Sequence, residues 1–168
     1  MLLDNKVRIL IVDSAEDKNR NCILLRMKEQ LSLRDLADIV IIGKCNSGRA
    51  VKEYVEKEEI DLLITFNMGG FEWTTLTNGL AYNILKCKQV HFLLDKPLKN
   101  ETLLSKQLSI AMFFYCVDAE YRKELLLKYP DIPYLEVLPE WSDNDDLQNK
   151  VKSLCVAIEQ VIDISRLR

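Results

Sequence analysis

The sequence contains few of the residues from which metal and nucleotide sites are usually built. It has a single histidine, His91, and no two of its five cysteines have CxxC spacing. Zinc sites combine several closely spaced cysteines and histidines, so we expect no metal site. The five glycines form neither a GxGxxG sequence nor a P-loop sequence. We therefore predict no classical dinucleotide or P-loop site and no cofactor.

Long apolar runs and basic clusters are also missing. No apolar stretch approaches the roughly 20 residues of a membrane-spanning helix, and the start, MLLDNKVRILIVD, lacks the pattern of a signal peptide. The net charge is −3 and no four basic residues are consecutive, so we expect no nucleic-acid binding through phosphate contacts. With cysteines that are reduced and mostly structural, the chain is predicted to be cytoplasmic, without a membrane span. Peripheral contact with a membrane stays open.

Strand-like and helix-like segments alternate along the whole chain. Short apolar runs rich in β-branched residues predict strands at 7–12, 38–43, 60–66, 89–94, 110–117 and 134–138. Amphipathic spacing and capping residues predict helices at 14–31, 49–57, 74–86, 100–107 and 119–129, and a closing helix at 145–164. In the first helix, Cys22 and Leu25, together with Ile23 and Met27, are expected to form the buried stripe.

This alternation predicts the class of fold. Strands joined by single helices run parallel, because the crossover is right-handed almost without exception. We therefore expect an α/β, Rossmann-like three-layer sandwich with about six mostly parallel strands and helices on both faces. The expected strand order is near 3-2-1-4-5-6. No internal repeat or linker is evident, so residues 1–168 are predicted to form a single domain.

Polar residues follow the apolar strands, and in a parallel sheet these carboxyl ends share one edge, where ligands bind. The candidate catalytic residues there are Asp13 and Asp95. The candidate ligand-binding residues are Asn67, Gly69, Gly70, Lys96 and Asp118.

Each candidate has a structural alternative. Gly69 and Gly70 could cradle a phosphate ahead of a helix N-terminus, or simply permit a sharp turn. Asp13 could act as a base or cap the first helix. Trp73 and Trp141 could form an aromatic platform or only pack. His91 is expected at the start of the fourth strand, at the opposite edge, where it is structural or exposed and not a general base.

Three segments resemble response-regulator receivers: ILIVD, GKCNSGRAVKEYV, and DKP after a later strand. Receivers carry an acidic pair after the first strand, a phospho-accepting Asp at the end of the third, and Lys-Pro after the fifth. Here Asp13 is followed by Ser14, and the third strand ends at Thr65-Phe66-Asn67 without a carboxylate. Lys96 follows the predicted fourth strand. The resemblance therefore implies a degenerate receiver-like signalling or interaction domain.

Residues 60–139 resemble the N-terminal, acceptor-side domain of bacterial spore-maturation-type glycosyltransferases of the GT-B class. The resemblance rests on DLLITFNMGGFE, on VHFLLDKPL, and on FFYCVDAEYRKELLLKYPDIPYLEVLP. It implies that Asp13 or Asp95 deprotonates an acceptor hydroxyl and that Lys96 offsets negative charge. It also implies a last helix that packs back across the sheet near the first strand.

The leading hypothesis is therefore a GT-B-like half-domain that lacks the nucleotide-sugar-binding half. It would depend on a second glycosyltransferase subunit, or only bind a glycan or protein acceptor. The receiver-like interaction domain is the alternative. A stand-alone hydrolase ranks third, because no Ser-His or Cys-His pair supports it.

Overall fold

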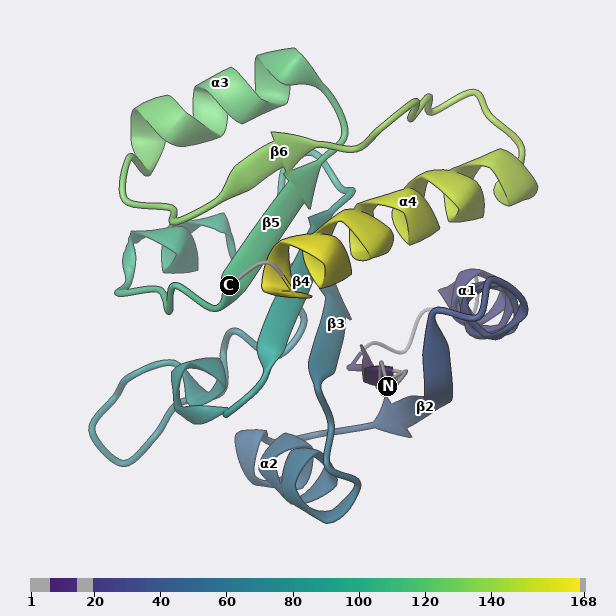
Figure 1. Ribbon diagram of the computed structural model, residues 1–168. Coiled ribbons are helices and arrows are strands. Elements are labelled where there is room, and N and C mark those ends of the chain that lie inside the picture. The colour runs from purple at the N-terminus through teal and green to yellow at the C-terminus, as the bar shows by residue number, and fades with distance from the viewer. Residues whose placement is uncertain (1–6, 15–19, 167–168) are drawn as a thin grey trace.

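All six strands lie in one parallel sheet (Figure 1). The computed structural model describes residues 7–14 and 20–166. The strands are β1 (Val7–Asp13), β2 (Ala37–Lys44), β3 (Leu62–Phe66), β4 (Lys88–Leu93), β5 (Met112–Cys116) and β6 (Leu135–Val137). The predicted parallel sheet is confirmed.

Helices cover both faces, which makes the molecule a three-layer sandwich. On one face lie α1 (Arg20–Leu33) and α4 (Leu147–Arg166), and on the other α2 (Gly48–Lys57) and α3 (Ala119–Lys128). The pleat of β1 separates the two cores: Ile9 and Ile11 pack in the α1–α4 core, and Leu10 and Val12 in the other. The predicted α/β Rossmann-like class is confirmed.

The predicted strand order is wrong. The sheet runs β2-β1-β3-β4-β5-β6, because β3 pairs directly with β1 through Ile9 and Leu62, Leu10 and Leu63, and Ile11 and Ile64. The alternation of strands and helices does not determine on which side of β1 the third strand is added. The direction of addition therefore reverses between β1 and β3, as in the flavodoxin-like order of doubly wound sheets.

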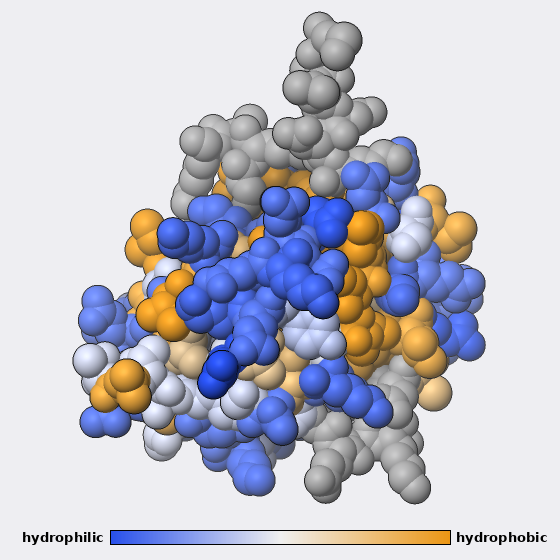
Figure 2. Space-filling view, turned by 90° about the horizontal axis from the view of Figure 1, so that it is seen from below, coloured by the Kyte–Doolittle hydropathy of each residue, from blue (hydrophilic) through white to orange (hydrophobic). Residues whose placement is uncertain are grey.

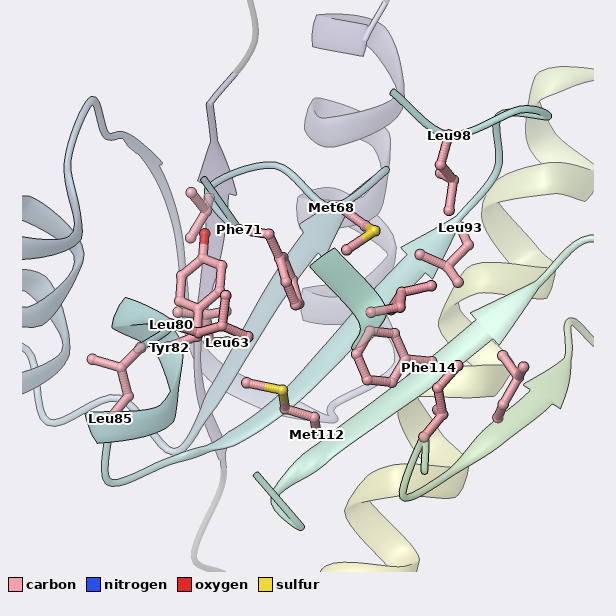
Figure 3. Close-up of a cluster of buried hydrophobic side chains, with 14 of the residues drawn as sticks. Leu63, Met68, Phe71, Leu80, Tyr82, Leu85, Leu93, Leu98, Met112 and Phe114 are labelled. Atoms are coloured by element: carbon pink, nitrogen blue, oxygen red, sulfur yellow. The ribbon is translucent and has the colours of Figure 1, made fainter. Parts of the chain in front are cut away.

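The helix predicted at 74–86 is absent. Residues 67–87 form turns, an isolated bridge between Thr74 and Leu80, and a 3₁₀ helix, η1 (Ala81–Ile84). Phe71, Leu80 and Tyr82 point into the core from this segment (Figure 3). A second short 3₁₀ helix, η2 (Glu101–Ser105), lies within the predicted 100–107 helix. Residues 67–87 therefore cover the sheet with individual buried side chains instead of with one face of an α-helix.

The predicted buried stripe of α1 is also partly wrong. Leu24, Met27 and Leu31 are buried, whereas Cys22 and Leu25 are exposed. The sequence CILL places apolar residues on several sides of the helix, so composition alone did not identify the side that faces the sheet.

A chain of buried polar side chains joins β3 and β4 to the 67–87 segment. His91 lies inside β4, fully buried, in the structural role that was expected but not at the start of the strand. Its Nδ1 lies 2.6 Å from Thr65 Oγ1 and its Nε2 3.1 Å from Gln89 Oε1. Gln89 Nε2 donates to the Tyr82 carbonyl oxygen at 2.7 Å. The Tyr82 hydroxyl in turn donates to the Gly69 carbonyl oxygen at 2.7 Å.

These bonds assign the proton on His91. Because Gln89 uses its nitrogen to donate to Tyr82, its oxygen accepts from His91 Nε2–H, and Nδ1 accepts from the Thr65 hydroxyl. The ring lies among Phe71, Tyr82 and Phe114. Burial lowers the pKa of His91 from 6.5 to about 3, so the ring is neutral at physiological pH.

The low pKa of His91 predicts acid sensitivity. Below about pH 6.5 the unfolded chain binds a proton that the folded chain excludes down to about pH 3, so stability falls as the pH decreases through this range. At about 1.4 kcal/mol per pH unit, this histidine lowers the free energy of unfolding by about 2 kcal/mol between pH 7 and pH 5. Urea unfolding at the two pH values should show this extra loss in the wild type and not in His91→Gln. Equal losses in both proteins would contradict the assignment, since the carboxylates are common to both.

Candidate functional site

The predicted site residues lie at the carboxyl edge of the sheet, after different strands. Asp13 is the last residue of β1, and Asn67 follows β3 directly. Asp95 and Lys96 lie just beyond β4, and Asp118 lies beyond β5 at the start of α3. The parallel sheet places these strand ends at one edge. The catalytic and binding roles of these residues stay predictions.

Asn67 joins the ends of β3 and β4. Its side-chain oxygen accepts hydrogen bonds from the backbone N–H groups of Leu94, at 2.7 Å, and Asp95, at 2.8 Å. Its own backbone N–H donates to the Phe92 carbonyl oxygen. The residue adopts a left-handed backbone with φ 50°, which asparagine tolerates better than most residues. Both hydrogen bonds to the Asn67 side-chain oxygen are therefore structural, because this oxygen faces the backbone at the end of β4.

Gly69 and Gly70 form a tight turn after β3. A Cβ on Gly69 would lie 2.1 Å from Ser14 Oγ, and one on Gly70 would lie 2.0 Å from the Tyr82 hydroxyl. Gly70 also has φ 88°, a conformation that other residues rarely adopt. The Gly69 N–H donates to the Phe66 carbonyl oxygen. Because no α-helix follows, the helix N-terminus on which the phosphate-cradle hypothesis depended is absent, and the geometry fits the sharp-turn alternative.

The two tryptophans make contacts within the fold. Trp73 is half-buried, with its ring centroid 6.2 Å from that of Tyr82. Trp141, also half-buried, donates from Nε1 to Asp143 Oδ1 at 3.1 Å, and Lys150 Nζ lies 5.5 Å from its ring centroid. These contacts favour packing over an aromatic platform.

Lys96 and Asp118 form an ion pair across the edge. Lys96 Nζ lies 3.2 Å from Asp118 Oδ2 and 4.8 Å from the centroid of the Tyr121 ring. Asp118 is the N-cap of α3, and its Oδ1 accepts from the Tyr121 N–H at 2.7 Å. This backbone hydrogen bond, followed by Lys96, holds the pKa of Asp118 below its usual range. Both charged groups therefore bind partners inside the chain.

The Cys45 thiol, near the Asp13 carboxylate, has a raised pKa. The Cys45 N–H donates to the Asp13 carbonyl oxygen at 3.2 Å, and the buried Cys45 side chain faces the core. Burial and the Asp13 carboxylate raise the pKa of Cys45 to about 11. Burial likewise raises the pKa of Cys116 and Cys155 to about 11 and that of Cys87 to about 12. These four thiols stay protonated at neutral pH and are poor nucleophiles.

Two surface cavities lie away from most of the predicted residues. One, of about 550 Å³, lies beside the amino end of β3 and is lined by Ile60, Asp61, Ile84 and others. The other, of about 520 Å³, lies between the end of β6 and α4, lined by Pro139, Glu140, Asp145, Asn149, Lys152, Ser153 and Val156. The sequence pattern did not single out the α4 residues of this cavity, because the polar face of α4 looks like ordinary helix surface.

Residues 7–14 and 20–166 contain neither a cluster of metal-ligating side chains nor a helix that could span a membrane. No group of three or more histidine, cysteine or acidic side chains is placed to hold a metal ion within these ranges. No helix in them combines the length and the apolar character needed to cross a membrane.

Comparison with known proteins assigns no family. No family model matches the chain, and no curated protein matches it. Among solved structures, a signal receiver domain from Vibrio parahaemolyticus is similar to 97% of this chain over 98% of its own length, with 9% sequence identity and a TM-score of 0.41. A likeness at this level assigns neither a family nor a function.

The bonds of Asn67 predict a specific pattern of stability. Asn67→Gly keeps the left-handed backbone but removes the acceptor of two N–H groups, which should lower the free energy of unfolding by about 1–3 kcal/mol. Asn67→Asp keeps an acceptor oxygen in place and should stay near the wild type. Chemical denaturation of the three proteins at neutral pH measures the difference. Equal stability of the Gly and Asp variants would show that the side-chain oxygen contributes nothing.

Proposed function

We propose that this chain is a non-catalytic interaction domain with a receiver-like sheet and no phospho-accepting carboxylate. The observation that carries the proposal is Asn67. It follows β3, where the receiver pattern has its phospho-accepting Asp, and its oxygen binds the backbone of β4. An amide in this position cannot form an acyl phosphate.

The surrounding groups support the same proposal. Asp13 is followed by Ser14, so a second metal-binding acid is missing there. Lys96 follows β4, whereas the receiver pattern has its Lys-Pro after the fifth strand. The carboxylate of Asp118 also neutralises the charge of Lys96. The order of the first five strands, β2-β1-β3-β4-β5, agrees with a flavodoxin-like sheet. In this proposal the protein works in the cytoplasm, where its five free cysteines stay reduced.

The acceptor-side half of a GT-B glycosyltransferase is a second proposal. The placement of α4 favours it: this helix packs across the face of the sheet, in one core with Ile9 and Ile11 of β1. In this case Asp13 or Asp95 would take the proton of an acceptor hydroxyl, and a second subunit would hold the sugar nucleotide. We rank it below the first, because Asn67 and Lys96 are already bound within the chain.

Phosphorylation tests the first proposal. The full chain, incubated with acetyl phosphate and Mg²⁺, should gain no phosphoryl group by intact-mass spectrometry, because the end of β3 offers an amide instead of a carboxylate. A functional receiver treated in parallel verifies the reagent. Stable labelling of the wild type at any acidic residue of this edge would overturn the proposal.

A thermal-shift panel of nucleotide sugars, nucleotides and glycans separates the two proposals. The first predicts no shift of the melting temperature with any of them. Lys96→Ala alone should change the ligand-free melting temperature little, because an exposed ion pair contributes at most about 1 kcal/mol. A shift in the wild type that disappears in Asp95→Ala and Lys96→Ala, but persists in the neighbouring control Lys99→Ala, would favour the glycosyltransferase half-domain instead.

A further inference from the structure

Residues 74–80 form a small hairpin between β3 and η1. Thr74 and Leu80 make an antiparallel bridge at its base. Beyond the bridge, the Thr75 N–H donates to the Gly79 carbonyl oxygen at 2.8 Å, and the Asn78 N–H donates to the Thr75 carbonyl oxygen at 3.0 Å. Asn78 has a left-handed backbone with φ 61°. This is the common three-residue hairpin loop, in which a turn is followed by one left-handed residue.

The tip of this hairpin lies in solvent. Leu76 is fully exposed, and Thr77 and Asn78 are exposed as well. The hairpin is the teal loop that extends from the molecule at the lower left of Figure 1. In the view from below, pale side chains of intermediate hydropathy gather on this side, as expected for a loop with three threonines (Figure 2). Water therefore has access to the side-chain amide of Asn78.

The peptide nitrogen of Gly79 lies next to this amide in the chain and is unobstructed. In the part of the chain that the structure describes, no hydrogen bond reaches the Gly79 N–H or the side-chain amide of Asn78. A Cβ built on Gly79 would have only Thr75 Oγ1 within 4 Å, at 3.5 Å. Because glycine has no Cβ, its nitrogen can approach a neighbouring side chain more closely than that of any other residue.

Lys106 adds a positive charge at the same peptide group. Its Nζ lies 3.4 Å from the Asn78 carbonyl oxygen. Lys106 is held beside the hairpin as the C-cap of η2, where its N–H donates to the Leu103 carbonyl oxygen at 3.1 Å. When the Gly79 nitrogen loses its proton, the negative charge is shared with the Asn78 carbonyl oxygen. A cation beside that oxygen stabilises the anion, which is the nucleophilic form of the peptide group.

We propose that Asn78 is a site of spontaneous deamidation and that Lys106 assists the reaction. The Gly79 nitrogen forms a bond with Asn78 Cγ, the bond between Cγ and Nδ2 breaks, and the amide leaves as ammonia with the proton of the Gly79 N–H. Water then opens the cyclic imide at either carbonyl carbon and leaves aspartate or isoaspartate. The rotation that brings the nitrogen to Cγ releases the hydrogen bond between Thr75 and Gly79, which belongs to the exposed hairpin and not to the sheet.

The modification changes the hairpin in two ways. Either product carries a carboxylate in place of the amide, close to the ammonium group of Lys106. Isoaspartate in addition inserts one carbon atom into the backbone of the loop. The reaction uses only Asn78, Gly79, Lys106 and water, so it does not depend on the proposed function.

Peptide mapping by mass spectrometry tests the site. During incubation of the folded full chain at neutral pH, Asn78 should be converted at least tenfold faster than Asn46, which is also exposed in a loop but is followed by Ser47. Gly79→Ala should slow conversion at least tenfold and leave the melting temperature unchanged, because the position has space for a Cβ and no left-handed backbone. Equal rates at Asn78 and Asn46, or an unchanged rate in Gly79→Ala, would overturn the site.

A charge variant tests the role of Lys106. In the folded chain, Lys106→Gln should slow the conversion of Asn78 at least threefold, whereas Lys99→Gln, an equal change of charge at an exposed lysine, should leave the rate unchanged. In chains unfolded by urea, the wild type and Lys106→Gln should react at the same rate, because only the fold places Lys106 beside Asn78. Equal rates in the folded proteins, or a slowing by Lys106→Gln that persists in urea, would overturn the assistance by Lys106.

Discussion

The arrangement of the carboxyl edge depends on one side-chain oxygen. By accepting both the Leu94 and the Asp95 N–H, Asn67 fixes the end of β4 against the end of β3. The left-handed backbone at Asn67 and Met68 then turns the chain back toward the sheet, and Gly69 and Gly70 complete the turn against Ser14 and Tyr82. From Tyr82 the hydrogen bonds continue through Gln89 and His91 to Thr65 in β3. This series of hydrogen bonds allows residues 67–87 to cover the sheet without an α-helix.

Several polar groups of this edge are engaged in hydrogen bonds and ion pairs within the chain. A site that reacts with a ligand needs polar groups whose hydrogen bonds are made with that ligand, whereas here Asn67, Lys96 and Asp118 bind groups of the chain itself. The one histidine is neutral, buried and surrounded by aromatic rings. The four buried thiols have raised pKa values. His91 and these four cysteines are therefore part of the packed interior.

The sequence predicted the layers well and the connections less well. Six strands were located correctly to within a few residues, because each is a short apolar run that ends in polar residues. Strand order was not predictable in the same way, since hydrophobic periodicity reports burial and not the identity of the neighbouring strand. The stretch from Thr74 to Lys86 has helix-like spacing, but Asn78 at φ 61° and the hydrogen bond from Thr75 to Gly79 form a turn there.

The gathering of Asp13, Asn67 and Lys96 at one edge followed from parallel strands. The partners of Asn67 did not, because they are backbone groups 27 and 28 residues away that only the folded chain brings close.

The two borders of the sheet are unequal in length, with eight residues in β2 and three in β6. β6 offers only three residues, one of them Glu136, whose carboxylate lies 3.7 Å from Arg122. A border so short and charged is a poor template for another strand. The β2 border is longer, but the register shift at Asp38 interrupts its regular pairing with β1 near one end. Each border of the sheet therefore carries a feature that natural proteins use against uncontrolled strand addition: brevity and charge at β6, and a bulge at β2.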